Sequence, residues 1–129
     1  MGLDMMARTL RTRPGKDVDF EAGKESEELW QWRKHPDLHG WMEALWRRKG
    51  GQGEPGMDGP NTFNCVPVLL EATDLDALET AVKEGTLPPT SGFFFGHSGP
   101  GDAAGDLKFI AKARAAIAAG KFVYYTSWW

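Results

Sequence analysis

Three segments of this chain carry apolar residues at helical spacing, and a glycine follows each of them. The spacing predicts helices over about 34–49, 73–84 and 106–118 (or from 102). Glycine at positions 50, 85 and 120 is typical of a helix end. The last extended segment, FVYYTSW at 122–128, has the composition of a β-strand. Because helical and extended segments alternate in one short chain, we predict an α+β fold.

Two further extended segments complete the predicted architecture. Residues 3–12 and 63–71 read as strands, and Pro67 should confine the second to a sheet edge or a bulge, because proline cannot donate a ladder hydrogen bond. The Gly- and Pro-rich stretch 49–62 is predicted to be a loop. This order favours a small, mostly antiparallel sheet with helices on one side, in a single domain over 1–129.

The beginning of the first helix has two interpretations. Ser26 is followed by two glutamates, which is typical of a helix N-terminus. Pro36 would then kink a long helix; alternatively, it lies in the first turn of a helix that begins near residue 34. In either case we predict that His39 and Trp41 are largely buried on the inward face.

The composition disfavours several classes of protein. The 129 residues carry a formal net charge of −3, which argues against a dedicated electrostatic binder of nucleic acids. The single cysteine allows no internal disulfide, and no apolar run approaches membrane-spanning length, so we expect a cytoplasmic protein. The chain is unusual in its aromatic residues, which are 6 Trp, 7 Phe and 2 Tyr. They can line a ligand pocket or a partner surface as well as fill a core.

Three consecutive phenylalanines stand in the segment TSGFFFGHSGPGD, residues 90–102. If this segment is extended, Phe93 and Phe95 share one face and Phe94 takes the other. Phe94 is then exposed unless a ligand, a partner subunit or the long loop covers it. His97 lies in the glycine-rich continuation, which leads to a helix N-terminus where free N–H groups favour anions. These features would suit a nucleotide; the alternative is a hydrophobic turn whose glycines serve its geometry.

Trp32 and Arg33 form a second candidate feature. An arginine beside an aromatic ring can pair with a carboxylate or a phosphate. The alternative is a solvated face with Trp32 in the core. The functional interpretation predicts one surface that unites Arg33, Phe94 and His97.

Metal binding and cysteine chemistry are weaker possibilities. His35 and His39 are four residues apart, so on a helix they would share a face, as paired metal ligands do. A third ligand would have to be His97 or Cys65, and we predict that no metal is bound. Cys65 could form a nucleophilic pair with His39 only if the fold brings them together; a single cysteine is more often structural and buried. For His39 we expect a packed histidine bonded to the sheet.

Two segments together resemble a widespread family of small proteins found mainly in bacteriophages and prophages. They are WRKHPDLHGWM (32–42) and LPPTSGFFFG (87–96), followed by Asp106-Leu107 and the C-terminal YYTSW. The likeness spans residues 30–128; His39 fits the family pattern, whereas His35 does not. The resemblance implies an accessory protein of a virus or mobile element that acts inside a bacterium, and it implies no mechanism.

These features predict a binding protein rather than an enzyme, and no cofactor. Its partner would be a host small molecule, with a nucleotide-like defence signal as the leading case, so that the protein interferes with bacterial immunity. Two alternatives stay open: a protein that masks a host enzyme or nucleic-acid complex, and a small hydrolase that uses His39, Arg33 or Cys65. The protein could also bind a second copy of itself and form a homo-oligomer. The candidate ligand-binding residues are Arg33, His39, Phe94, His97, Trp32 and Tyr125.

Overall fold

The computed structural model describes residues 2–23, 25–52, 54–56, 59–90, 96, 98–99 and 101–129. Their helices and strands are, in chain order, β1 (Asp4–Leu10), β2 (Glu27–Arg33), α1 (Pro36–Arg48), β3 (Glu54–Gly56), β4 (Gly59–Thr62), β5 (Val68–Leu70), α2 (Ala72–Glu84), α3 (Asp102–Ala118) and β6 (Phe122–Trp128). Among the described residues, no helix is long and apolar enough to cross a membrane.

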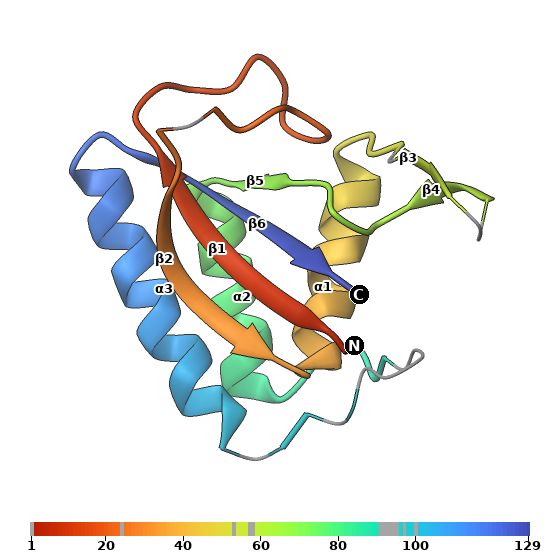
Figure 1. Ribbon diagram of the computed structural model, residues 1–129. Helices are drawn as coiled ribbons and strands as arrows, with labels where there is room; N and C mark the ends of the chain where they lie inside the picture. The colour runs from red at the N-terminus through yellow and green to blue at the C-terminus, as the bar shows by residue number, and fades with distance from the viewer. Residues whose placement is uncertain are drawn as a thin grey trace.

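The main sheet contains four strands in the order β2-β1-β6-β5, and each pairing is antiparallel. Figure 1 shows α1, α2 and α3 together on one face of this sheet, and none of the described residues forms a helix on the opposite face. Asp4 pairs with Trp128, so β1 begins where β6 ends. The predicted α+β fold, with an antiparallel sheet and helices on one side, is confirmed.

Alternation along β1 assigns its side chains to the two faces. Met5 and Ala7 are fully buried under the helices, whereas Met6 and Arg8 are half-buried on the opposite face. On that opposite face Tyr124 packs with Leu10 and Phe20. Trp128, at the end of β6, remains 68% exposed.

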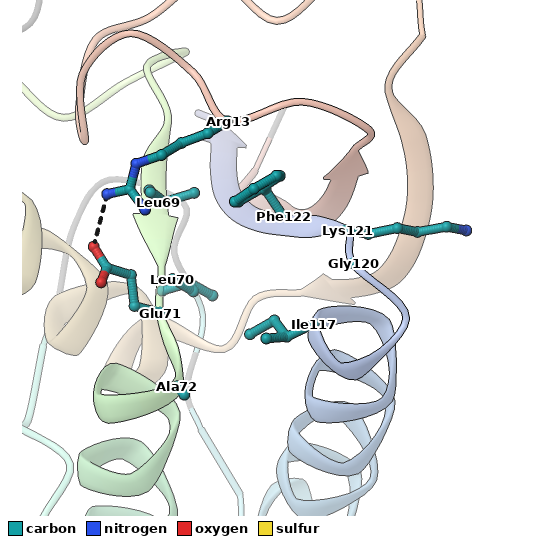
Figure 2. A pocket seen from close by; sticks show the side chains of 9 residues that line it. All are labelled: Arg13, Leu69, Leu70, Glu71, Ala72, Ile117, Gly120, Lys121 and Phe122. Atoms are coloured by element: carbon teal, nitrogen blue, oxygen red, sulfur yellow. Dashed lines mark hydrogen bonds and ion pairs between the residues drawn. The ribbon is translucent and has the colours of Figure 1, made fainter.

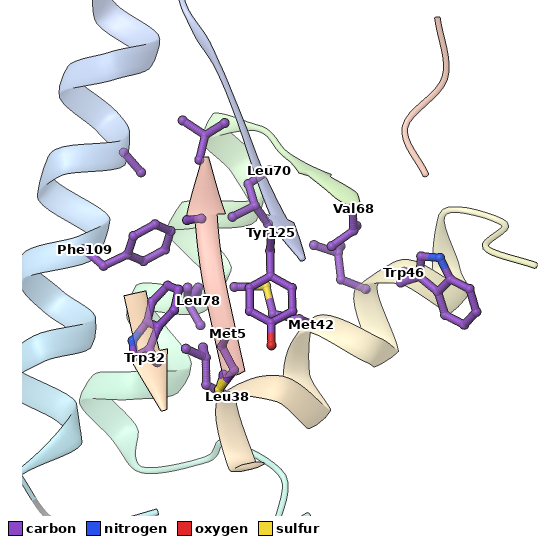
Figure 3. Close-up of a cluster of buried hydrophobic side chains, with 14 of the residues drawn as sticks. Met5, Trp32, Leu38, Met42, Trp46, Val68, Leu70, Leu78, Phe109 and Tyr125 are labelled. Carbon is purple, nitrogen blue, oxygen red and sulfur yellow. The ribbon is translucent and has the colours of Figure 1, made fainter. Parts of the chain in front are cut away.

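One continuous core lies between the sheet and the three helices. Figure 3 shows Trp32 beside Phe109 and Tyr125 near α1. The ring centroids of Trp32 and Phe109 are 4.8 Å apart in an edge-on arrangement, which is favourable for aromatic pairs. The same core extends to Leu70 and Leu78, so all three helices bury a face in it.

Residues 27–33 form a strand, so the interpretation of a long helix from Ser26 is wrong. Trp30 and Trp32 favour extended backbone, and pairing with β1 outweighs the helix-like start signal. Lys34 adopts a left-handed conformation with φ of 55°, which separates β2 from α1. Pro36 lies in the first turn of α1, as the alternative interpretation predicted.

The inward face of α1 includes Trp46 rather than Trp41. His39 is buried as predicted, with 1% exposed, but Trp41 is only half-buried at the margin of the core. Trp46 is fully buried, and its Nε1 donates to Asp19 Oδ1 over 2.7 Å. Trp46 stands four residues after Met42, so it belongs to the same buried face of α1 as Met42.

Other boundaries differ from expectation for local reasons. The stretch 49–62, predicted as a loop, contains the two-stranded ribbon β3–β4; glycine-rich turns also serve such ribbons. The strand predicted over 63–71 is reduced to β5, an edge strand, as Pro67 requires. α2, predicted to start at 73, is capped by Glu71 through reciprocal bonds with the backbone and side chain of Asp74.

Candidate functional site

His35, Ser98 and Asp106 form a hydrogen-bonded chain near the beginnings of α1 and α3. His35 Nε2 lies 2.8 Å from Asp106 Oδ2, and His35 Nδ1 lies 2.6 Å from Ser98 Oγ. His35 and Asp106 are buried, with 3% and 1% exposed, respectively. Trp32 Nε1 donates to the other oxygen of Asp106, Oδ1, over 3.1 Å. The imidazole therefore bridges a buried carboxylate and a serine hydroxyl.

The proton positions follow from what each group can donate or accept. A carboxylate only accepts, so His35 Nε2 carries a proton and donates it to Asp106. In the neutral imidazole Nδ1 is then an acceptor, and Ser98 donates its hydroxyl proton to it. The backbone N–H of Asp37 donates to Ser98 Oγ over 3.1 Å. The Ser98 hydroxyl is thus held by an acceptor on one side and a donor on the other.

Local backbone geometry brings these side chains together. His35 is the N-cap residue of α1, held between the left-handed Lys34 and the rigid Pro36. Gly96 adopts φ of 76° and lies against the Lys34 side chain, so that a Cβ at this position would meet Lys34 Cβ at 2.9 Å. Gly96, two residues before Ser98, therefore lies against the corner between β2 and α1.

A pocket of about 180 Å³ opens beside this hydrogen-bonded chain and is called the His35 pocket below. Its polar lining includes His35, Ser98, Asp37 and Asp102, and Val82 and Leu87 add apolar surface. Asp102 Oδ2 lies 3.7 Å from His35 Nδ1 and accepts the Gly99 N–H over 2.6 Å. Because carboxylates border the pocket, it favours neutral or cationic groups over anions.

His39 and Tyr125 lie in the core rather than in the His35 pocket. His39 Nδ1 is 2.8 Å from Tyr125 Oη, and the imidazole stacks on Phe63 with ring centroids 5.1 Å apart. Burial lowers the pKa of His39 to about 4 and raises the pKa of Tyr125 well above its usual range. These contacts are those of a packed histidine bonded to the sheet.

The lowered pKa of His39 predicts a loss of stability in mild acid. The unfolded chain takes up a proton near pH 6.5, whereas folded His39 stays neutral down to about pH 4. Stability is therefore fully present above pH 6.5 and falls as the pH decreases toward 4. We expect a loss of about 2 kcal/mol between pH 7 and pH 5, measured by urea unfolding. His39→Gln should remove most of this slope; an unchanged slope in that variant would assign it to other groups.

Trp32 and Arg33 point to opposite faces of β2. Trp32 does not line the His35 pocket but holds Asp106 in place. Arg33 is exposed at the end of the strand, with Nε 3.8 Å from Asp4 Oδ1. Phe94 and His97 lie outside the described residues, so the surface predicted to unite them with Arg33 stays a prediction.

Cys65 is not the buried structural cysteine that we expected. Its side chain is exposed, its Sγ contacts Asn64 Oδ1 over 3.5 Å, and desolvation raises the pKa of its thiol, which reduces its nucleophilicity. His39 is engaged with Tyr125 instead. Within the described part of the chain, no group of three or more His, Cys, Asp or Glu side chains is arranged to hold a metal.

Sequence reasoning missed Ser98 and Asp106, and it considered His35 only as a metal ligand. One signal was present. Asp106 occupies an inward position of α3 among apolar residues such as Phe109 and Ile110. A carboxylate at such a position requires a buried partner, and this requirement could have been recognised without the structure.

A second pocket, of about 240 Å³, lies at the opposite end of the helical layer. Figure 2 shows the paired Arg13 and Glu71 on one side of it and Ile117 and Phe122 on the other. Arg13 Nη2 lies 3.3 Å from both Glu71 Oε1 and Asp17 Oδ1, so its charge is balanced within the protein. This pocket offers apolar surface, but its Arg13 and Glu71 side chains are directed toward one another rather than toward a ligand.

Comparisons of the chain with protein-family models, with curated proteins and with solved structures gave no match.

Proposed function

We propose that this chain is a phage-type accessory binding protein that captures a small host molecule in the His35 pocket. The observation that carries the proposal is the His35–Asp106 pair, which is buried but reaches the pocket through Ser98. Small-molecule sites combine apolar walls with a few well-placed polar groups, and the His35 pocket contains both. The phage context and a role against bacterial defence rest on the sequence resemblance.

The acidic lining determines which part of a ligand would enter the pocket. Asp37 and Asp102 repel a phosphate but accept hydrogen bonds from hydroxyl and amino groups. The volume of about 180 Å³ suits one ring or a short chain and is smaller than a typical site for a drug-sized ligand. A nucleotide-like host signal would therefore enter through its base or ribose, with its phosphates outside.

A pair of neighbouring alanines allows a matched test of this site. Ala103 lines the pocket, whereas Ala104 is exposed one residue further along α3. The larger side chain of Ala103→Leu should obstruct the pocket. Because leucine is a good helix former, this change should cost little stability. We expect nucleosides and small amino or hydroxyl compounds to bind the unmodified protein. Ala103→Leu should weaken binding at least about tenfold in calorimetric titration, and Ala104→Leu should leave it unchanged.

The same two variants connect binding to biology. Bacteria that carry a nucleotide-signalling defence system would express the protein during phage infection, with phage yield as the readout. Ala103→Leu should abolish any rescue of the phage, and Ala104→Leu should retain it. Equal rescue by both variants, or tight binding that Ala103→Leu does not affect, would place the ligand site elsewhere.

A second candidate function is the masking of a host protein. The observation that favours it is Trp128, which is 68% exposed and which alternation along β6 places on the sheet face opposite α1, α2 and α3. Large aromatic side chains in such positions are common anchors of protein interfaces. In the infection assay above, loss of rescue by Trp128→Ala but not by Ala103→Leu would favour this alternative.

A further inference from the structure

We propose that Ser98 is an activated nucleophile, with His35 as its general base and Asp106 as the residue that positions the imidazole. The inference rests on the proposed function in that the same pocket receives the substrate, and it adds acyl transfer to binding. Because His35 departs from the phage-family pattern, this activity would be a property of this chain rather than of that family.

The distances and burial of the three groups are those that nucleophilic catalysis requires. Ser98 Oγ lies 2.6 Å from His35 Nδ1, and His35 Nε2 lies 2.8 Å from Asp106 Oδ2. A nucleophile, a base within hydrogen-bond reach and a third group that orients the base define such a site. Asp106 is itself held by Trp32 Nε1, so rotation of the imidazole would break its buried hydrogen bond to a fixed acceptor.

The two nitrogens of the imidazole exchange the roles that they have in the serine proteases. Here the carboxylate contacts Nε2 and the hydroxyl contacts Nδ1. In both arrangements the carboxylate selects the tautomer whose unprotonated nitrogen faces the serine. The carboxylate also stabilises the imidazolium that forms when the serine proton is transferred. The reversed orientation therefore preserves the chemical requirement.

The reaction would be the hydrolysis of an ester through an acyl group carried on Ser98. Ser98 Oγ forms a bond to the carbonyl carbon of an ester, its proton moves to His35 Nδ1, and the carbonyl electron pair moves to oxygen. The electron pair on that oxygen then re-forms the carbonyl, the bond from carbon to the leaving alkoxy oxygen breaks, and this oxygen takes the proton from Nδ1 to leave as the alcohol. Water releases the acyl group from Ser98 by the same steps, which yields a carboxylic acid and regenerates the serine.

The surroundings indicate the substrate class. Ala103 lines the pocket in the first turn of α3. The Asp102 N–H donates to Gly99 O over 3.1 Å, so the oxyanion donors would be the following N–H groups of that turn, which have no carbonyl partner within the helix. The carboxylates of Asp37 and Asp102 disfavour anionic acyl groups. We therefore assign a small ester with an uncharged or cationic acyl part.

Methanesulfonyl fluoride, which is small and uncharged, provides a direct test. Ser98 Oγ would bond to its sulfur, the sulfur–fluorine bond would break, fluoride would leave, and His35 would take the serine proton. Intact mass spectrometry with peptide mapping should find one adduct per chain, on Ser98. The Ser98→Ala variant should show none, whereas Ser26→Ala, which removes a serine bonded to Arg8 and Tyr124, should be labelled normally.

The positioning role of Asp106 has its own readout. In Asp106→Asn the labelling rate should fall roughly 100-fold or more, and its pH profile should shift, because the base is no longer held in the productive tautomer. Asp76→Asn, which changes an aspartate outside the pocket that pairs with Arg114, should stay within a few-fold of the unmodified protein. Circular dichroism checks that each variant is folded, and His35→Gln replaces Asp106→Asn if the latter is not.

The outcomes separate this inference from the proposed function. An unlabelled protein, an adduct that persists in Ser98→Ala, or a rate unaffected by folded Asp106→Asn would overturn the nucleophile. If the nucleophile is rejected in this way but Ala103→Leu still loses ligand binding, the proposed binding function is supported without catalysis. Labelling of Ser98 without any bound nucleoside or small hydroxyl compound would support the nucleophile and reject the proposed ligands.

Discussion

Trp46→Ala is expected to lower the free energy of unfolding by about 3 to 5 kcal/mol. The side chain is fully buried at the C-terminal end of α1, and Gly51 packs directly against its ring. Its Nε1 also donates to Asp19 Oδ1 over 2.7 Å, which ties α1 to the segment between β1 and β2. Removing the ring therefore leaves a large cavity and eliminates a link between two elements. Urea unfolding at pH 7 measures the change.

Trp41→Ala provides the control for this expectation. It removes the same side chain from the same helix, but from a half-buried position at the margin of the core. We expect a loss of about 1 to 2 kcal/mol, in proportion to the smaller apolar area that it buries. Equal losses in the two variants would contradict the orientation of α1 described above.

Asp106→Ala is expected to cost about 3 kcal/mol or more, although it removes only a small polar side chain. The deletion leaves two buried donors, His35 Nε2 and Trp32 Nε1, without their acceptor. The cost of an unpaired buried donor exceeds the net value of the bond that it made. Thermal and urea unfolding should both show the loss.

Asp102→Ala is the matched comparison, one helical turn earlier on α3. Its side chain is 40% exposed, so water can replace its bonds. We expect a loss of about 1 kcal/mol from the weakened N-terminus of the helix. A larger loss in Asp102→Ala than in Asp106→Ala would show that the buried network is not what holds α3 to β2.

Several elements could be predicted because local chemistry determines them. FVYYTSW coincides with β6, since β-branched and aromatic residues strongly favour extended backbone. The end of α2 was predictable at Gly85, which adopts φ of 67° and so takes the left-handed conformation that closes a helix.

Residues 27–33 could not be predicted from local signals. A serine followed by two glutamates is typical of a helix start, but β1 pairs with this segment along its length, with one register shift between Ala7 and Arg8. Trp32 also gains contacts with Phe109, which no local pattern reveals. Tertiary pairing therefore decided the conformation of this segment.

The candidate site illustrates the same limit more sharply. His35 is separated from Ser98 by 63 residues and from Asp106 by 71. Each of the three has an ordinary local interpretation: a residue before a proline, a loop serine, a helix-start aspartate. Only the packing of α3 against β2 makes them one group. In contrast, the burial of His39 followed from apolar spacing alone.

The position of β6 has a consequence for how this protein is made. The strand follows every other helix and strand in the sequence, yet it lies between β1 and β5 in the sheet. While the chain emerges from the ribosome, neither of these strands can acquire its inner neighbour until residues 122–128 have been synthesised and released from the exit tunnel. The nascent chain must hold its helices and the β1–β2 hairpin with an incomplete core. Closure of the sheet is therefore a late event, governed by the slow formation of contacts between distant segments.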